Sequence, residues 1–162
     1  MSSQKICVST KQSFQSYCSE NELKIFKVPA DGHCLIYSFL VAVYGNYNQY
    51  NQILISIKQE LVNNINKWIE YTPYCSNHQI YYDSIKEYLN NKVWDSTLCD
   101  IMLNCLSKIL KTKVKIRQVE NNHLKMLMIQ SYESNYQRTI HIKFESYHYD
   151  ALVKSKFFYL KD

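Results

Sequence analysis

The chain has 162 residues, of which 46% are hydrophobic and 20% are charged, so it is long and apolar enough for one folded domain. This composition excludes an intrinsically disordered chain. The formal net charge of +5 is mild, and the basic residues are scattered, with the densest run at 108–117. Since nucleic-acid-binding proteins concentrate basic residues on one face, we expect no nucleic-acid partner and interpret the run as a solvated surface.

The sequence predicts neither a secretory signal nor a membrane span. Its first twenty residues are polar, and no stretch approaches the roughly 18 apolar residues that a spanning helix needs. The six cysteines include no C-x-x-C pair, so we expect reduced thiols and a cytoplasmic location. Cys75 and His78 have a ligand-like spacing, but no second pair follows at zinc-finger distance, and we predict no metal site.

The first third of the chain predicts one short strand and one buried helix. Residues 1–22 are polar and rich in Ser and Gln, and form either an N-terminal arm or a marginal helix. Residues 23–28 alternate in polarity, as a short strand does. Residues 34–44 are too apolar for a surface helix, and predict a buried helix that ends at Gly45.

Three further helices are predicted in the middle of the chain. Residues 51–70 place apolar side chains at spacings of three and four, which is typical of an amphipathic helix. Residues 79–91 predict a third helix. A fourth, carrying an apolar stripe up to Ile109, begins after a cap at Asp95 or Ser96.

After residue 111 the hydrophobic period changes from 3.6 to 2, which indicates strands. The two asparagines at 121 and 122 predict the turn of a hairpin. Helices followed by a mostly antiparallel sheet define an α+β domain, which we expect to span residues 1–162. Strands are expected at 113–120, 123–131, 138–145, 148–153 and 156–160.

The stretch VPADGHCLIYSFL (28–40) places a cysteine at the start of the predicted buried helix, behind an Asp-Gly turn. Positive partial charge at a helix start favours the thiolate of Cys34. A sharp turn at Gly32 also lets backbone N–H groups point towards a developing oxyanion. This arrangement is the one that acyl transfer to a thiol requires.

A thiol nucleophile needs a base, and the best candidate among the five histidines is His148. Residues i and i+2 of a strand project to one face, so Asp150 can orient the His148 imidazole. His33 adjoins the cysteine but is expected to point away from it, and His141 lies on the polar side of a predicted strand. On these residues alone, a buried structural cysteine and a surface histidine remain the alternative.

Four segments in order resemble the OTU (ovarian tumour) family of cysteine proteases. VPADGHCLIYSFL resembles the family's nucleophile motif, Asp-Gly-x-Cys-Leu, and YHYDALV (147–153) is similar to its catalytic histidine segment. Between them, VWDSTLCDIMLNCLSKIL (93–110) and VKI (114–116) resemble the family's tryptophan-led helix and the strand after it. The chain is therefore identified as a member of this family from about residue 24 to its end.

The resemblance implies a papain-like OTU fold, with a central, mostly antiparallel sheet flanked by helices. It implies that Cys34 attacks an isopeptide carbonyl, that His148 is the general base and then the general acid, and that Asp150 orients His148. Asp31 and its backbone would either shape the oxyanion loop or contact the histidine directly. Family members remove ubiquitin or ubiquitin-like modifiers from conjugates without a metal or cofactor, and we expect a monomer.

Two positions depart from the family pattern. The residue before the cysteine is often Asn and is His33 here, and the glycine that usually follows the tryptophan is Asp95. Residues 51–91 are the candidate surface for the globular body of ubiquitin, through Tyr71, Tyr74, Tyr81 and Tyr82. For Trp94 and Tyr149, core packing is the alternative to substrate contact. The positions that the resemblance implies for substrate binding or for the oxyanion hole are Gly32, His33, Tyr147, Tyr149 and Trp94.

Two other functional hypotheses are a non-catalytic ubiquitin-binding or scaffold module and a basic nucleic-acid-binding domain. The first predicts binding without cleavage, and the second predicts clustered charge, of which the sequence has little.

The abundance of Tyr, Asn, Ile and Lys is typical of proteins encoded by AT-rich genomes, such as those of some viruses, protists and intracellular bacteria. From such a source, the enzyme would act on ubiquitin conjugates in the host cytosol.

Overall fold

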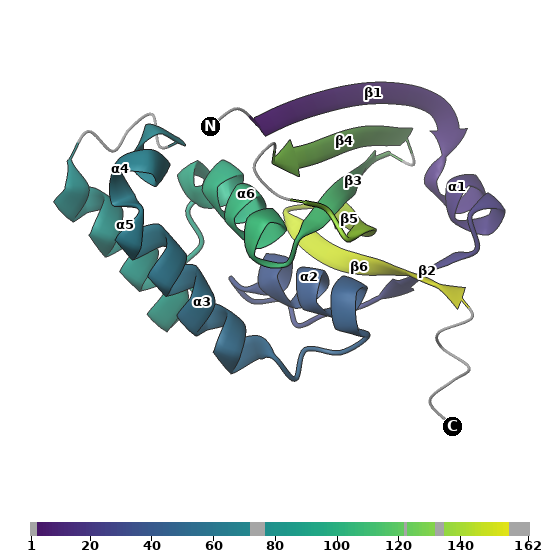
Figure 1. The fold of residues 1–162 in the computed structure, drawn as a ribbon. Coiled ribbons are helices and arrows are strands. Elements are labelled where there is room, and N and C mark those ends of the chain that lie inside the picture. Colours follow the sequence, from purple (N-terminus) through teal and green to yellow (C-terminus); the bar gives the residue numbers. More distant parts are fainter. Residues whose placement is uncertain (1–2, 72–76, 122, 132–134, 156–162) are drawn as a thin grey trace.

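A single six-stranded sheet, in the order β1-β4-β3-β5-β6-β2, organises the protein (Figure 1). The computed structural model describes residues 3–71, 77–121, 123–131 and 135–155. Among the described strands, β3 and β5 pair in parallel and the other neighbours are antiparallel, so the α+β class is confirmed. The strands are β1 (Ser3–Ser13), β2 (Leu23–Phe26), β3 (Thr112–Glu120), β4 (His123–Ser131), β5 (Arg138–Glu145) and β6 (His148–Lys154).

The larger helices form two layers beside the sheet (Figure 1). Helices α2 (Cys34–Tyr44) and α6 (Cys99–Ile109) contact the strands, while α3 (Tyr50–Asn63) and α5 (His78–Asn91) pack outside them. Within the described residues, no helix is long and apolar enough to cross a membrane. The remaining elements are α1 (Phe14–Glu20), α4 (Ile65–Trp68), η1 (Ile69–Tyr71) and η2 (Ser96–Leu98).

Helix α2 runs through the centre of the main core, which explains its unusually apolar sequence. Its eight residues from Cys34 to Val41 are all buried, between the sheet on one side and the outer helices on the other. The helix ends at Gly45, which has a φ of 79° and donates its amide to the Val41 carbonyl. Burial on all sides holds the first residue of α2, Cys34, in a fixed position.

Two segments differ from their predicted structure. The helix expected over 51–70 is interrupted at Asn64, whose side-chain amide donates to the Glu60 carbonyl at 3.1 Å and competes with the helical pattern. Within residues 1–22, expected to be an arm or a marginal helix, residues 3–13 form the edge strand β1, which pairs with β4, whereas Phe14–Glu20 form the short helix α1. The strand expected over 156–160 lies outside the described residues.

His141 is less exposed than its place in the strand pattern predicted. It lies on β5 and is partly buried, and its Nδ1 has no hydrogen-bond partner among the described residues. Burial lowers its pKa to about 4, and the positive charges of Arg117, Lys115 and Lys154 act in the same direction. The ring therefore stays neutral at neutral pH. It lies at the opposite end of the β5–β6 pair from His148.

Candidate active site

A compact turn leads into helix α2, and Asp31 closes it with both its backbone and its side chain. The Asp31 carbonyl accepts the Cys34 amide at 3.2 Å, and its Oδ1 accepts the His33 amide at 2.8 Å. The side chain thus forms an Asx turn of the kind that Asp favours at the entry to a helix. The turn brings Cys34 to the first position of α2.

Gly32 is required by close packing and not by an unusual backbone angle. We expected this residue to permit a sharp turn, but its φ is not positive. A Cβ atom at this position would lie 1.8 Å from the Lys92 carbonyl oxygen and 2.7 Å from the carbonyl carbon. The backbone at the end of α5 therefore rests directly on the glycine, and only a residue without a side chain fits.

His148 and Asp150 form a hydrogen-bonded pair at the start of β6, as their i, i+2 spacing predicts. The His148 Nε2 lies 2.9 Å from the Asp150 Oδ1. The same oxygen accepts the Val28 amide at 3.0 Å, which anchors the carboxylate from the segment after β2. Because a carboxylate is an acceptor, Nε2 is the donor, and the lone pair of the neutral ring is on Nδ1.

The Cys34 thiol lies beside the same strand. Its residue is 8% exposed, and the backbone amides of Tyr149 and Leu35 favour its thiolate form. Burial raises the pKa of the thiol, these two amides oppose the increase, and the carboxylates of Asp31 and Asp150 add to it. The amide at the helix start does favour the thiolate, as expected, but desolvation outweighs it and the pKa of the thiol is raised. Forming the thiolate requires a base.

Asp31 contributes to the turn and not to the histidine pair. Its Oδ2 accepts a hydrogen bond from Lys92 Nζ at 2.9 Å and one from the Tyr37 hydroxyl at 3.2 Å. Burial opposes ionisation, but the bonds from Lys92 and the His33 amide outweigh it and lower the pKa of Asp31. Among the described residues, no hydrogen bond joins Asp31 to His148. Of the two alternatives for this residue, the geometry favours shaping of the loop.

Two of the candidate substrate residues are accessible. Tyr147, at the β5–β6 turn, is 95% exposed and has a φ of 61°, which is rare for a bulky residue. Trp94 is 37% exposed and packs edge-on against Tyr88, with ring centroids 5.4 Å apart. Trp94 therefore combines partial packing with an accessible surface, and Tyr147 directly precedes the His148 of the histidine pair.

The side chains of two other candidates do not face solvent. The Tyr149 ring is buried against Phe144, and its hydroxyl lies 3.4 Å from the Cys99 sulfur. His33 is 0% exposed, and both nitrogens of its ring contact helices α3 and α5. The burial of Tyr149 agrees with the core-packing alternative, and the ring of His33, the other substrate-binding or oxyanion candidate, is turned away from solvent.

The proposed ubiquitin-facing tyrosines are divided by the structure. Tyr81 is buried, and its hydroxyl donates to the Leu61 carbonyl at 3.3 Å, so it belongs to the core. Tyr82 is exposed on α5. The Tyr71 side chain and Tyr74 lie outside the described residues, as does Cys75. Within the described part of the chain, no three His, Cys, Asp or Glu side chains converge as a metal site would require.

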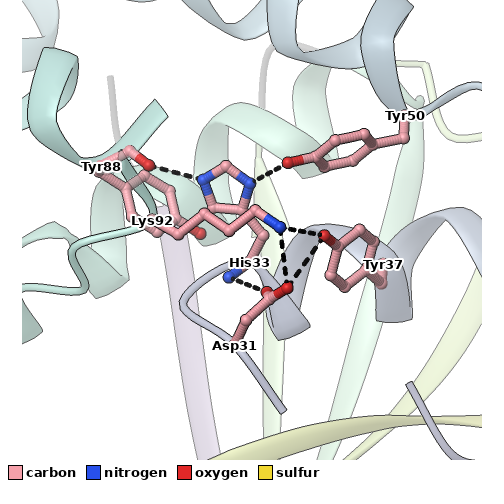
Figure 2. A network of polar contacts seen from close by, with 6 residues as sticks. All are labelled: Asp31, His33, Tyr37, Tyr50, Tyr88 and Lys92. Atoms are coloured by element: carbon pink, nitrogen blue, oxygen red, sulfur yellow. Dashed lines mark hydrogen bonds and ion pairs between the residues drawn. The ribbon is translucent and has the colours of Figure 1, made fainter. Parts of the chain in front are cut away.

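The sequence did not identify the residues that surround the turn. Figure 2 shows Asp31 and His33 enclosed by side chains from α2, α3 and the end of α5. The one available signal was a lysine just after the last residue of a predicted helix, where glycine is common. Nothing in the residue spacing indicated the tyrosines. The residues that sequence analysis missed are Tyr37, Tyr50, Tyr88 and Lys92.

Comparison with known proteins gives a consistent family. A model of the OTU-like cysteine proteases matches residues 29–156, and no curated protein matches significantly. The OTU domain protease of Dera Ghazi Khan virus aligns with a TM-score of 0.64 and 17% identity, covering 90% of this chain and 88% of that one. The OTU domain of OTUD1 has a TM-score of 0.65 and 15% identity, with coverages of 85% and 89%.

A third structure, the Hazara virus OTU bound to ubiquitin, aligns with a TM-score of 0.62 and 18% identity over 93% of this chain and 89% of that one. The shared fold has the expected central sheet with flanking helices. Since the family model extends from the turn before Cys34 to the end of β6, it covers the whole candidate site. The protein belongs to the family of OTU-like cysteine proteases.

Proposed function

We propose that the protein is a thiol-dependent deubiquitinase that hydrolyses isopeptide or peptide bonds at the C-terminus of ubiquitin or a ubiquitin-like modifier. The observation that carries this proposal is the His148–Asp150 pair, held by the Val28 amide, on β6, the strand that packs against α2, the helix that begins at Cys34. Membership of a cysteine protease family supports the reaction type. The Hazara virus relative, solved with ubiquitin, supports the substrate class.

The proposed reaction begins with proton transfer from the Cys34 thiol to His148 Nδ1. The thiolate attacks the carbonyl carbon, and we propose that a backbone N–H group of the turn before Cys34 that does not already donate to Asp31 stabilises the oxyanion. His148 then protonates the leaving amine, which leaves a thioester on Cys34. In the second half, His148 takes a proton from water as the oxygen attacks the thioester; the C–S bond breaks, the modifier leaves with a free carboxyl group, and His148 returns the proton to the Cys34 sulfur. Asp150 keeps Nε2 as the donor throughout.

The accessible aromatic residues beside the site are proposed to bind the extended tail of the modifier. Tyr147 precedes the catalytic candidate His148, and Trp94 follows the end of α5 that packs on Gly32. Ser146 and Tyr147 both have positive φ, as a two-residue hairpin turn requires, and this turn presents the Tyr147 side chain to solvent. We place the activity in the cytoplasm, in the host cytosol if the source is a virus or an intracellular microbe.

A ubiquitin carrying a C-terminal electrophile tests the proposed function directly. We expect one covalent adduct per protein, located at Cys34 by peptide mass spectrometry, together with cleavage of at least one linkage in a panel of diubiquitins. A folded protein that reacts with neither ubiquitin nor ubiquitin-like probes would contradict the proposal. Binding of ubiquitin without an adduct would favour the non-catalytic module instead.

Replacing Asp150 should lower activity through the orientation of His148. We expect Asp150→Ala to reduce kcat/KM by about 10²- to 10⁴-fold, since the imidazole loses its acceptor. The Val28 amide loses its partner as well, so thermal stability also falls. Asp150→Asn, which retains an acceptor oxygen, serves as the matched variant and should keep more of both properties. Wild-type turnover by Asp150→Ala would remove this residue from the proposed triad.

A further inference from the structure

We infer that His33 is a positioning residue, which pins the turn before Cys34 to the outer helices through Tyr50 of α3 and the C-terminal end of α5 (Figure 2). The inference rests on the proposed function and adds to it a residue that sets the geometry of the reaction without touching substrate. The residue before the cysteine is often Asn in the family, and here it is His33.

The His33 ring is held at both nitrogens. Its Nε2 lies 2.6 Å from the Tyr88 carbonyl oxygen and its Nδ1 lies 2.5 Å from the Tyr50 hydroxyl. A carbonyl only accepts, so Nε2 carries the hydrogen; in the neutral ring, Nδ1 then accepts from Tyr50. The ring is 0% exposed and packs edge-on against Tyr88, with centroids 4.8 Å apart. One tautomer of the neutral ring therefore satisfies both contacts.

The end of α5 also holds the two residues before His33. Lys92, with φ 58° and ψ 29°, occupies the left-handed position that ends the helix, and its amide donates to the same Tyr88 carbonyl at 3.0 Å. Its carbonyl oxygen rests on Gly32, and its Nζ bonds to Asp31 at 2.9 Å. Three consecutive residues, 31 to 33, are thus each joined to the last turn of one helix.

The left-handed lysine supports a positioning role. Glycine would be easier at this backbone angle, but it could not supply the ammonium group that reaches Asp31 and the Tyr37 hydroxyl, which accepts from Nζ at 3.0 Å. The Asp31–Lys92 pair is partly exposed, so its value lies in geometry more than in energy. The position of the turn amides therefore depends on the helical layer.

Burial favours the neutral form of His33, which sets the direction of its pH dependence. Burial lowers the pKa of His33 and Lys92 adds to this, while the Tyr88 carbonyl and the charge of Asp31 oppose it. The groups that face the ring are Asp31 from the turn, Tyr37 from α2, Tyr50 from α3, and Tyr88 and Lys92 from α5.

Imidazolium has no lone pair, so protonation makes Nδ1 a donor to the Tyr50 hydroxyl and leaves a positive charge on a ring that is 0% exposed. With a folded pKa below the ordinary value of 6.5, the contribution of His33 is complete above the ordinary value and is lost as the pH falls through the folded one.

Steady-state kinetics on a ubiquitin substrate near neutral pH test the role of His33. His33→Ala should lower kcat by about 10- to 100-fold, because small displacements of the turn misplace the oxyanion donors, while KM changes by less than about twofold. His33→Gln should recover part of the kcat that His33→Ala loses, since the glutamine side chain is long enough to place an amide N–H near the position of the His33 Nε2. His141→Gln is the matched control, removing another neutral histidine remote from the site, and should retain kcat.

The imidazole ¹⁵N spectrum provides a readout independent of activity. We expect His33 to show a protonated Nε2 and an unprotonated Nδ1, and to keep this tautomer below the pH at which an exposed histidine titrates. An imidazolium near neutral pH, or a hydrogen on Nδ1, would overturn the assignment of its partners.

The kinetic outcomes separate the inference from the proposed function. An active wild type with unchanged kcat in His33→Ala overturns the inference alone, as does a kcat loss no greater than that of His141→Gln. A folded wild type without activity on ubiquitin or ubiquitin-like substrates overturns the proposed function, and the catalytic part of the inference with it.

Discussion

The Cys34→Ala variant is expected to bind ubiquitin conjugates but to leave them intact, with kcat lowered by about 10⁴-fold or more. The loss is large because the thiol forms the covalent bond in the proposed mechanism, and no other group can replace it in the acyl-enzyme. Since only the sulfur is removed at the first residue of α2, the fold should change little. Both cleavage of diubiquitin and reaction with the electrophilic probe report the loss.

A second cysteine supplies the control for this variant. Cys18 lies on α1, away from the candidate site, and burial raises the pKa of its thiol. Cys18→Ala removes one thiol and should leave labelling and turnover at the wild-type level. Cleavage by Cys34→Ala at the wild-type rate would mean that a different nucleophile carries the reaction, whereas equal binding of ubiquitin by the wild type and Cys34→Ala, with no cleavage by either, would support a scaffold module.

The Gly32→Ala variant should lose both stability and activity. An added Cβ would lie 1.8 Å from the Lys92 carbonyl oxygen, a backbone atom that moves only if the end of α5 moves. We expect a cost of roughly 3 kcal/mol in the free energy of unfolding, at the upper end of overpacking effects. Where the variant remains folded, displacement of the turn should still reduce kcat.

A variant of Gly45, the other glycine of the chain, serves as the control that distinguishes the effect of close packing from the effect of the backbone angle. Gly45 has a φ of 79°, and a Cβ there would meet nothing within 4 Å. Gly45→Ala should therefore cost only about 1 kcal/mol, from left-handed strain, with activity retained. Thermal unfolding and turnover measured on both variants make the comparison. Equal losses of stability, or full activity in Gly32→Ala, would contradict close packing at Gly32.

Local patterns predicted the elements whose signals lie within a few residues. The buried helix at 34–44 and its end at Gly45 are confirmed, as is the hairpin of β3 and β4. The break at Asn64 was not predicted, because the apolar spacing continues across this residue while the helical backbone is interrupted there. The edge strand β1 was not predicted for a different reason: its hydrogen-bonding partner is β4, which lies more than a hundred residues away in the sequence.

In the candidate site too, some features follow from local sequence and others depend on tertiary packing. The His148–Asp150 pair follows from strand geometry alone, because residues two apart share a face. The protonation preference of Cys34 did not follow from its place at a helix start, since desolvation depends on what the whole fold packs around the thiol. Likewise, no spacing rule relates His33 to Tyr88, which are joined only by the packing of α5 against the turn.

The sequence by itself determined the family resemblance, the helices and strands with clear periodicity, and the identity of the candidate nucleophile, base and orienting acid. These properties reside in short stretches, where residue types and their spacing set the local backbone. Tertiary structure alone decided why Gly32 must be a glycine, where the His33 ring points, and that burial raises the pKa of the Cys34 thiol. Each of these depends on burial and contact between segments distant in the chain, which periodicity does not encode.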